Sequence, residues 1–388
     1  MWTQLQSLSA AHAFNRRLRN QLTNYQGNSD WRNLKVPSIA YLEPDKLDSP
    51  EIYERLIASY RNATRGDAVL GDGAWKVLSM NCHRELDGYL RDGDSKSVGK
   101  ILAKMFRDPV TSGLALGETA YFATKKNPYP AALDWHDKAI SFGQAVGVVP
   151  LQNPEQGAYG NLLHLDSIDV FRRSIERVGL AAFPPQVGSL FGVQFDSGVV
   201  PTNHLFHLYA AYRISTLFSD QQPACLEIGG GVGLLAYVAA SMGIRQYCIV
   251  DLPLVNVLQG YVLLRSGLAD TVQLYGEEPP ISESRISLLP SNTIDEVGSR
   301  SFDLVINQDS LPEMGYQTMI GYIKSIQRIS KGYFLSINQE ARASNGSGSS
   351  QGWVHDVCRA ESGMKLLYRA PYWLRKGYAE ELYRIIGA

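Results

Sequence analysis

The stretch Cys225-Leu-Glu-Ile-Gly-Gly-Gly-Val-Gly-Leu-Leu-Ala-Tyr-Val-Ala-Ala-Ser-Met-Gly243 reads as a short buried strand, a run of glycines and then a helix. Glycine tolerates the positive backbone angles of a sharp turn, and it leaves no side chain between the backbone and a ligand. The N-terminus of the following helix offers N–H groups to a polar or anionic group. The stretch therefore predicts a nucleotide-like ligand.

A second apolar run, Tyr247-Cys-Ile-Val-Asp251, reads as the next strand and ends on an acid. An acid in this place accepts hydrogen bonds from ribose hydroxyls in dinucleotide-binding folds. Glu227 comes two residues before the first glycine, where a pyrophosphate disfavours a carboxylate and a sulfonium ligand with an α-amino group favours one. The two acids favour a methyl donor, and an NAD-dependent oxidoreductase stays an alternative.

From this turn onward, strands alternate with helices. The expected strands are 225–229, 247–251, 302–308 and 332–338, and the third strand of the sheet is either 272–275 or 285–289. Continuous apolar strands separated by helices indicate a parallel sheet covered on both faces. We expect an α/β, Rossmann-like sheet of seven strands that ends with an antiparallel hairpin from residues 364–386.

The N-terminal half has a different pattern. Apolar residues recur there at helical spacing, for example in 50–60, 74–90 and 167–178, and no run is typical of a strand. Gly and Pro residues in 183–202 mark a change of character. We expect residues 1–195 to form a mostly helical domain, which supplies the acceptor pocket, a homodimer interface or both. Residues 196–388 are expected to bind the cofactor.

Composition narrows the class of protein. The chain has 388 residues, of which 45% are hydrophobic and 19% charged, and its net charge is −1. This balance is typical of a globular protein and gives no electrostatic attraction to nucleic acid or a membrane surface. Neither a signal peptide nor an apolar run of membrane-helix length is visible, so a cytoplasmic protein is expected.

The two motifs resemble those of the class I S-adenosylmethionine-dependent methyltransferases. The matching stretches are 226–234 and 249–255. The stretch Phe302-Asp-Leu-Val-Ile-Asn-Gln-Asp-Ser-Leu-Pro-Glu-Met314 and the C-terminal Tyr372-Trp-Leu-Arg-Lys-Gly-Tyr378 are similar to a bacterial family of sugar O-methyltransferases. This resemblance covers about residues 185–388, and the family carries a helical extension before them.

The resemblance implies that S-adenosylmethionine is bound by residues at the ends of the strands. Asp251 accepts both ribose hydroxyls, and Leu252 packs near the adenine. The contacts to the amino-acid part of the cofactor are Glu227 at its amino group, Gly229, Gly230 and Gly231 along the turn, and Asn307 or Gln308 after the fourth strand. The residue that meets the adenine amino group depends on which segment forms the third strand. Ser291 and Asn292 follow the candidate 285–289, and Gly276 and Glu277 follow the candidate 272–275.

Methyl transfer to a sugar hydroxyl needs alignment of the reacting atoms, and a general base helps. Ligands of open α/β sheets bind beyond the carboxyl ends of the strands, so the base is expected in the loops after the fourth and fifth strands. Asp309, Glu313 and His355 are the catalytic candidates. Glu313 equally suits the N-terminus of the helix that follows it.

Candidate acceptor contacts are His204 before the glycine strand, Glu340 after the fifth strand, and Trp353. Trp353 follows a Gly/Ser-rich stretch, 341–352, which reads either as a lid that stacks Trp353 on a sugar ring or as a surface loop. No spacing demands a metal. If Mg²⁺ takes part, as in some sugar O-methyltransferases of this fold, Asp309, Glu340 and Asp356 offer oxygen ligands.

The expected function is therefore S-adenosylmethionine-dependent O-methylation of a hydroxyl on a sugar or glycosylated small molecule. A small-molecule or glycan acceptor is the expected partner, rather than a nucleic acid or a membrane. Methylation of a phenolic or polyketide acceptor, an NAD-dependent oxidoreductase, and a non-catalytic module of the same fold remain alternatives.

Overall fold

The computed structural model describes residues 2–24, 34–47, 50–65, 72–114, 117–153, 155, 161–219, 221–244, 246–277, 285–340 and 352–386. The chain forms two compact units. Unit 1 consists of Met1–Asp45, Lys104–Leu217 and Trp373–Lys376, and unit 2 of Lys46–Ala103, Phe218–Tyr372 and Gly377–Ala388. This division differs from the expected boundary at residue 195, because residues 46–103 pack with the C-terminal sheet and residues 196–217 with the N-terminal helices.

Unit 2 is built on a sheet whose described strands have the order β10-β11-β9-β8-β4-β5-β7-β6. These strands are β4 (Ala224–Ile228), β5 (Gln246–Asp251), β6 (Val272–Gln273), β7 (Arg285–Pro290), β8 (Phe302–Gln308), β9 (Ser330–Gln339), β10 (Met364–Pro371) and β11 (Tyr378–Ile385). Strands β4 to β9 are parallel, whereas β11 lies antiparallel between β9 and β10. The expected parallel sheet and terminal hairpin are confirmed.

The sheet has eight described strands rather than the expected seven. Both candidates for the third strand form strands: Arg285–Pro290 pairs with β5, and Val272–Gln273 adds a short edge strand beside it. The sequence pattern could not separate them, because an edge strand of two residues looks like the start of a longer one.

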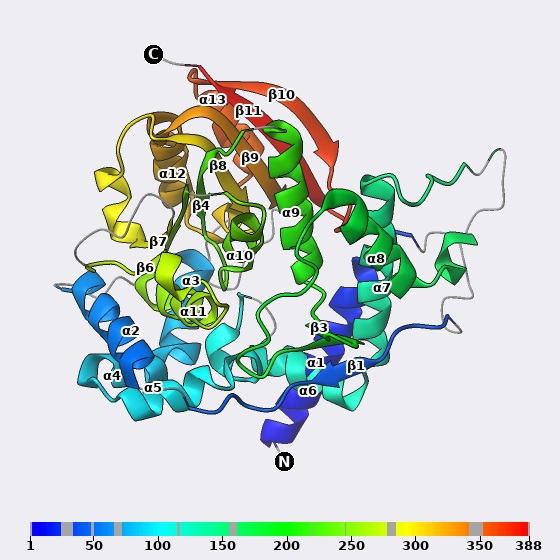
Figure 1. Ribbon diagram of the computed structural model, residues 1–388, viewed down its shortest axis with the longest axis horizontal. Coiled ribbons are helices and arrows are strands. Elements are labelled where there is room, and N and C mark those ends of the chain that lie inside the picture. Colours follow the sequence, from blue (N-terminus) through cyan, green and yellow to red (C-terminus); the bar gives the residue numbers. More distant parts are fainter. Residues whose placement is uncertain are drawn as a thin grey trace. The chain divides into compact units, whose positions relative to one another are not determined.

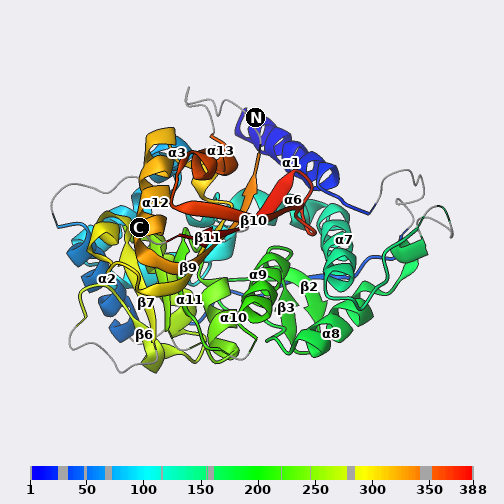
Figure 2. The same ribbon diagram turned by 90° about the horizontal axis from the view of Figure 1, so that it is seen from above.

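Helices cover both faces of this sheet, as Figures 1 and 2 show. Helices α10 (Leu234–Ser241) and α11 (Pro253–Leu264) lie on one face, and α12 (Tyr316–Ile329) and α13 (Val354–Ala360) on the other. Leu226, Val250 and Val305 of the strands pack with Met319 and Ile323 of α12 in one apolar cluster. The continuous apolar runs of the strands follow from this burial on both faces.

Four helices from the N-terminal half complete unit 2: α2 (Pro50–Ala63), α3 (Gly73–Cys82), α4 (Arg84–Asp92) and α5 (Ser95–Leu102). Helix α2 packs on α11, where the rings of Tyr53 and Tyr261 stack with centroids 6.4 Å apart. The helix expected over 74–90 is divided into α3 and α4 at His83.

Unit 1 contains α1 (Trp2–Asn20), α6 (Gly117–Lys126), α7 (Tyr129–Ala145), α8 (Ser167–Val178) and α9 (His204–Leu217). It also contains an antiparallel sheet of β1 (Ile39–Tyr41), β2 (Phe191–Phe195) and β3 (Gly198–Val200). The expectation that no strand forms before residue 195 is therefore wrong. Strand β1 is too short to show a pattern, and its partner lies far along the chain. None of the helices described in either unit is long and apolar enough to cross a membrane.

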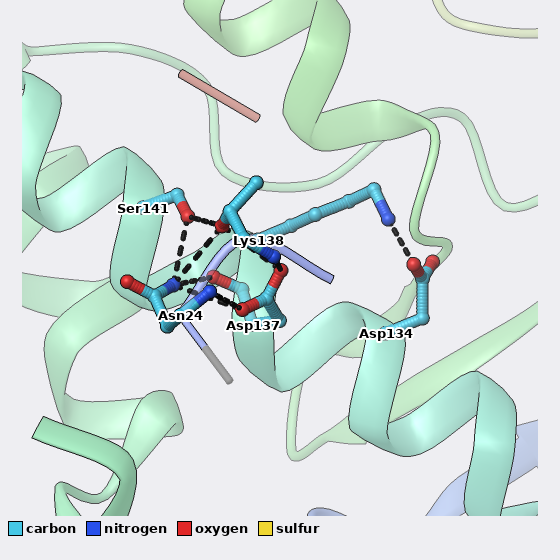
Figure 3. A network of polar contacts seen from close by, with 6 residues as sticks. Asn24, Asp134, Asp137, Lys138 and Ser141 are labelled. Atoms are coloured by element: carbon cyan, nitrogen blue, oxygen red, sulfur yellow. Dashed lines mark hydrogen bonds and ion pairs between the residues drawn. The ribbon is translucent and has the colours of Figure 1, made fainter. Parts of the chain in front are cut away.

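Helix α7 carries buried charges through the core of unit 1, as Figure 3 shows. The carboxylate of Asp137 accepts hydrogen bonds from the backbone N–H groups of Thr23 and Asn24, at 2.8 and 2.9 Å. One turn along the same helix, the ammonium of Lys138 forms an ion pair with Asp134. Both partners are almost fully buried, so the pair is satisfied internally rather than by water.

Candidate functional site

The strand order of unit 2 sets where a ligand binds. From β4 the chain moves to β5 and β7 on one side, and it later returns to β8 and β9 on the other side of β4. Connections therefore leave β4 and β8 in opposite directions, and such a switch point opens a crevice beyond the carboxyl ends of the strands. Glu227, Asp251, Asn307 and Gln308 were predicted from the sequence as cofactor contacts, and all lie at these ends.

The glycine turn after β4 has the geometry expected from the sequence. Gly229, Gly231 and Gly233 have positive φ angles of 73°, 55° and 83°. A Cβ atom on Gly229 would lie 2.2 Å from the hydroxyl oxygen of Ser310, and one on Gly230 would lie 2.6 Å from Ile249. Positions 229 and 230 therefore have no room for a side chain, and the turn leads directly into α10.

Glu227 lies in β4 and is buried, with only 2% of its surface exposed. Its Oε2 accepts a hydrogen bond of 2.9 Å from the hydroxyl of Tyr247 on β5. Burial raises the pKa of Glu227 to about 7, the bond from Tyr247 opposes this, and the nearby charge of Asp251 adds to it. A ligand that brings a positive group to this carboxylate would stabilise its charged form.

Asp251 ends β5 beside the glycine turn. Burial raises its pKa to about 7, although the backbone N–H of Leu252 and the side chain of Gln259 donate hydrogen bonds to its carboxylate. Leu252 is the N-cap residue of α11, and its expected contact with the adenine stays a prediction. A buried acid, Glu227, and a partly buried acid, Asp251, therefore lie beside the turn at the ends of neighbouring strands.

Gln259 is a site residue that the sequence reasoning missed. It lies fully buried on α11, and its Nε2 donates to Asp251 Oδ2 at 2.8 Å and to the carbonyl oxygen of Gly231 at 3.1 Å. Its Oε1 accepts a hydrogen bond from Asn256. Its polar side chain on a mostly apolar helix was the signal in the sequence. The structure shows that this side chain joins Asp251 to the glycine turn.

Asn307 at the end of β8 is buried, and its side chain is engaged inside the protein. Its Nδ2 donates to the carbonyl oxygen of Ile228 at 2.8 Å and to Ser310 Oγ at 2.5 Å, while its Oδ1 accepts from Asn338. Ser310 also donates to the carbonyl of Ile228. These bonds hold the loop after β8 against the glycine turn, so Asn307 positions the site.

Asp309 and Gln308 lie next to this network and carry the polar groups of the loop. Asp309 has a positive φ of 69°, which is uncommon for a residue other than glycine and frequent at functional sites. Its Oδ1 accepts a hydrogen bond of 2.6 Å from the hydroxyl of Tyr378. Gln308 Nε2 donates to the hydroxyl of Tyr372 at 3.4 Å, and the two tyrosine rings lie 6.4 Å apart.

The two tyrosines were noticed in the sequence only as part of the stretch 372–378. Nothing in their local pattern showed that they reach Gln308 and Asp309, because the contact joins β8 to the C-terminal hairpin. The structure therefore adds two aromatic hydroxyls to the loop that carries the catalytic candidate Asp309.

His355 lies on α13 and belongs to a second polar group. Its Nδ1 is 2.5 Å from Glu381 Oε1, and the hydroxyl of Tyr383 donates to the other oxygen of Glu381 at 2.9 Å. Arg369 bridges Glu381 and Glu340, with N–O distances of 2.6 and 2.5 Å. A buried acid that orients an imidazole suits a general base, so His355 stays a candidate beside Asp309.

The remaining predicted residues are spread over the chain. Glu313 ends a short 3-10 helix, Leu311–Glu313, directly before α12. Trp353 precedes α13 as its N-cap residue. His204 is buried at the start of α9 in unit 1, where burial and the neighbouring His207 lower its pKa to about 3. The roles of these residues in binding an acceptor or in catalysis stay predictions.

Two other expectations concern the loop and the metal. Residues 341–351 of the Gly/Ser-rich stretch lie outside the described residues. Within the described part, no group of three or more His, Cys, Asp and Glu residues could hold a metal ion. A cavity of about 640 Å³ in unit 2 is lined by residues of β5, β6 and β7, by residues 274–276 after β6 and by Phe302, and its described lining includes neither Glu227 nor Asp251.

Comparison with known proteins gives matches only among solved structures. No protein-family model and no curated protein match the chain. The structure of the [4+2]-cyclase SpnF is 14% identical, with a TM-score of 0.36, and the match covers 46% of this chain and 81% of SpnF.

Two methyltransferases are similar to the same extent. Magnesium protoporphyrin IX methyltransferase from Synechocystis PCC 6803, solved with bound SAM, is 10% identical over 47% of this chain and 79% of its own, with a TM-score of 0.33. The 1,6-didemethyltoxoflavin-N1-methyltransferase of Burkholderia thailandensis is 14% identical over 48% and 80%, with a TM-score of 0.34. These values are low, so the function has to be argued from the residues of this chain.

Proposed function

We propose that this protein is an S-adenosylmethionine-dependent O-methyltransferase. The observation that carries the proposal is a pair of acids, the buried Glu227 and the partly buried Asp251, at the ends of neighbouring strands beside the glycine turn. Burial raises the pKa of both to about 7, and a ligand that brings a positive group or hydrogen-bond donors would stabilise their charged forms. An α-ammonium group suits Glu227, and a ribose diol suits Asp251.

The residues present fit this cofactor better than they fit NAD. The glycine turn would hold the amino-acid part against bare backbone, since side chains on Gly229 and Gly230 would collide with Ser310 and Ile249. A pyrophosphate placed at the same turn would bring its negative charge beside Glu227, which like-charge repulsion opposes. When bound, S-adenosylmethionine supplies an electrophilic methyl group on positively charged sulfur.

Asp309 is the residue that we assign as the general base. It lies on the loop that Asn307 and Ser310 hold against the glycine turn, and its carboxylate already accepts a hydroxyl hydrogen bond, from Tyr378. An acceptor hydroxyl in hydrogen-bond reach of Asp309 would lose its proton to the carboxylate as the methyl group is transferred. Its strained backbone supports a role in function rather than in folding alone.

A sugar or glycosylated small molecule is the acceptor class that we infer. The polar groups around Asp309, which are Gln308 and the hydroxyls of Tyr372 and Tyr378, suit a ring that bears several hydroxyls, and aromatic faces suit its apolar side. A phenolic acceptor would use the same base and need fewer hydrogen bonds.

The test is methyl transfer from S-adenosylmethionine to a panel of free sugars, glycosides and the matching aglycones, with products identified by mass spectrometry. We expect methylation of glycosides and none of their aglycones. Methylation of the aglycones alone would replace the sugar with a phenolic or polyketide acceptor, and no transfer to any member, with no binding of S-adenosylhomocysteine, would contradict the proposed function.

A further inference from the structure

Residues 46–103 reach the carboxyl-end loops of the sheet of unit 2. Arg55 on α2 forms an ion pair of 2.7 Å with Glu277, which follows β6. The side-chain amide of Asn292, which follows β7, donates to the carbonyl oxygen of Ala63 at 3.4 Å. These loops are where ligands of such sheets bind, so the segment 46–103 borders the site on the side of β6 and β7.

The third contact of this kind is made by Asp72, and it is the most specific. Asp72 Oδ1 accepts a hydrogen bond of 3.0 Å from the backbone N–H of Gly315, and its Oδ2 accepts one from the hydroxyl of Thr318. Gly315 is the N-cap residue of α12 and has no side chain with which to cap the helix. A carboxylate 243 residues away in sequence therefore holds the start of α12, through the N–H of its N-cap residue and the hydroxyl of its third residue.

Asp72 is itself the N-cap residue of α3, which makes this use of its carboxylate notable. Its backbone carbonyl accepts from Trp75, but its side chain makes no cap hydrogen bond to α3 within the described residues. A Cβ atom on Gly315 would lie 2.3 Å from Asp72 Oδ2, so glycine at 315 is what admits the carboxylate. Asp72 and Gly315 therefore depend on each other. The carboxylate holds a helix whose N-cap residue has no side chain, and the missing side chain leaves room for the carboxylate.

Helix α12 connects the contact with Asp72 to the loop of the candidate site. The helix begins directly after the loop of Asp309 and the 3-10 helix Leu311–Glu313. Its Met319 and Ile323 pack in the same apolar cluster as Leu226 and Ile228 of β4. The loop before the helix is joined to the end of β4, because Ser310 Oγ donates to the carbonyl oxygen of Ile228 and accepts from Asn307 Nδ2. The first turn of α12 therefore continues from a loop that lies against the glycine turn.

We propose that Asp72 is a positioning residue of the methyl-donor site, which acts by fixing the first turn of α12 and thereby the preceding loop, 309–313, which Ser310 joins to the end of β4. This inference rests on the proposed function. It gives one residue of the segment 46–103, which the sequence assigned to a separate helical domain, a role in the cofactor site. The role is positional because both carboxylate oxygens of Asp72 accept hydrogen bonds from residues at the start of α12.

The test measures S-adenosylhomocysteine binding by calorimetry in the full-length chain. Asp72→Ala should weaken binding by about fivefold, because the loss of two hydrogen bonds to a carboxylate loosens the start of α12 and the loop before it. The matched control is Asp94→Ala on α5, because Asp94 caps its own helix by accepting from the backbone N–H of Ser97. The control should lower the melting temperature and leave the affinity unchanged.

A rescue variant separates positioning from a general loss of stability. In the Asp72→Ala background, Gly315→Ser places a cap on α12 from within, at a backbone φ of −63° that any residue can adopt. This double variant should recover the affinity of the wild type. Equal binding by Asp72→Ala and wild type would overturn the inference, as would failure of Gly315→Ser to restore affinity while the melting temperature recovers.

Hydrogen exchange of residues 311–322 in the ligand-free protein tests, without the cofactor, whether Asp72 fixes the start of α12. Asp72→Ala should speed exchange in this segment, and Asp94→Ala should not. If the wild type failed to bind S-adenosylhomocysteine, the proposed function would fail, and the exchange result would still decide whether Asp72 fixes α12. Unchanged exchange in Asp72→Ala would overturn that link by itself.

Discussion

The hydroxyl of Tyr378, at the start of β11, donates a hydrogen bond of 2.6 Å to the carboxylate of Asp309, at the end of β8. The bond joins the C-terminal hairpin to the loop that follows the switch point of the sheet. It also shows that the carboxylate of Asp309 accepts a hydrogen bond from a hydroxyl group. This relationship motivates the first prediction.

Asp309→Asn should lower kcat by about 10²–10⁴-fold, because it removes a general base and leaves the shape of the loop unchanged. The affinity for S-adenosylhomocysteine should stay that of the wild type. Initial rates with a saturating acceptor measure the effect. If His355→Gln caused the large loss and Asp309→Asn did not, the imidazole held by Glu381 would be the base.

Cofactor affinity should depend on pH through Glu227 and Asp251. Burial raises both pKa values to about 7, so protonated forms predominate below that pH in the ligand-free protein. An ammonium group and a ribose diol prefer the ionised acids. Affinity for S-adenosylhomocysteine should therefore rise from about pH 5 to about pH 8 and then level off.

The folding stability of the ligand-free protein should change with pH in the opposite direction to the cofactor affinity. An acid whose pKa is raised on folding binds its proton more tightly in the folded state, so the ligand-free protein should lose stability as the pH rises from about 4 to about 7. Calorimetry in buffers of different ionisation enthalpy should show proton release on binding near pH 7, reduced in Glu227→Gln. An affinity that falls over this pH range would contradict the assignment of both acids.

Gln259 should contribute to cofactor binding although its side chain is buried. Gln259→Leu removes hydrogen bonds to Asp251 and Gly231, and we expect about tenfold weaker cofactor binding, since a buried carboxylate loses a donor. Gln259→Glu places a second acid beside Asp251 and should move the pH dependence of binding to higher pH. Gln327→Leu, which removes a hydrogen bond to Glu361, is the control and should bind normally.

The buried ion pair of unit 1 gives a prediction on stability. Lys138→Met should lower the free energy of unfolding by about 3 kcal/mol, because it leaves the buried carboxyl of Asp134 without its partner. Asp134→Leu combined with Lys138→Met should recover most of this loss. Urea unfolding measures both, and Arg173→Met in the exposed pair with Asp169 should cost less than about 1 kcal/mol. A double variant less stable than Lys138→Met would refute the explanation.

The sequence was most informative where the determinants are local. Gly229 to Gly233 and Asp251 are each adjacent to a buried strand, so the turn, the acid and the parallel sheet could all be predicted from neighbouring residues. The burial of Glu227 at the end of β4 follows from its place in the strand, and its contact with the cofactor stays a prediction.

Contacts between distant segments escaped prediction for a physical reason. Tyr378 reaches Asp309 across 69 residues and Asp72 reaches Gly315 across 243, and no local periodicity encodes such pairs. The same limit explains the domain boundary. Helices α2 to α5 have ordinary amphipathic patterns, and a pattern shows that a helix buries a face without showing which surface covers it.

Calorimetric titration with S-adenosylhomocysteine and with NAD tests the central claim most directly. We predict that S-adenosylhomocysteine binds at a single site, that Asp251→Ala abolishes or strongly weakens this binding, and that NAD gives no signal. Binding of NAD with no binding of S-adenosylhomocysteine would contradict the claim and make the glycine turn a dinucleotide site.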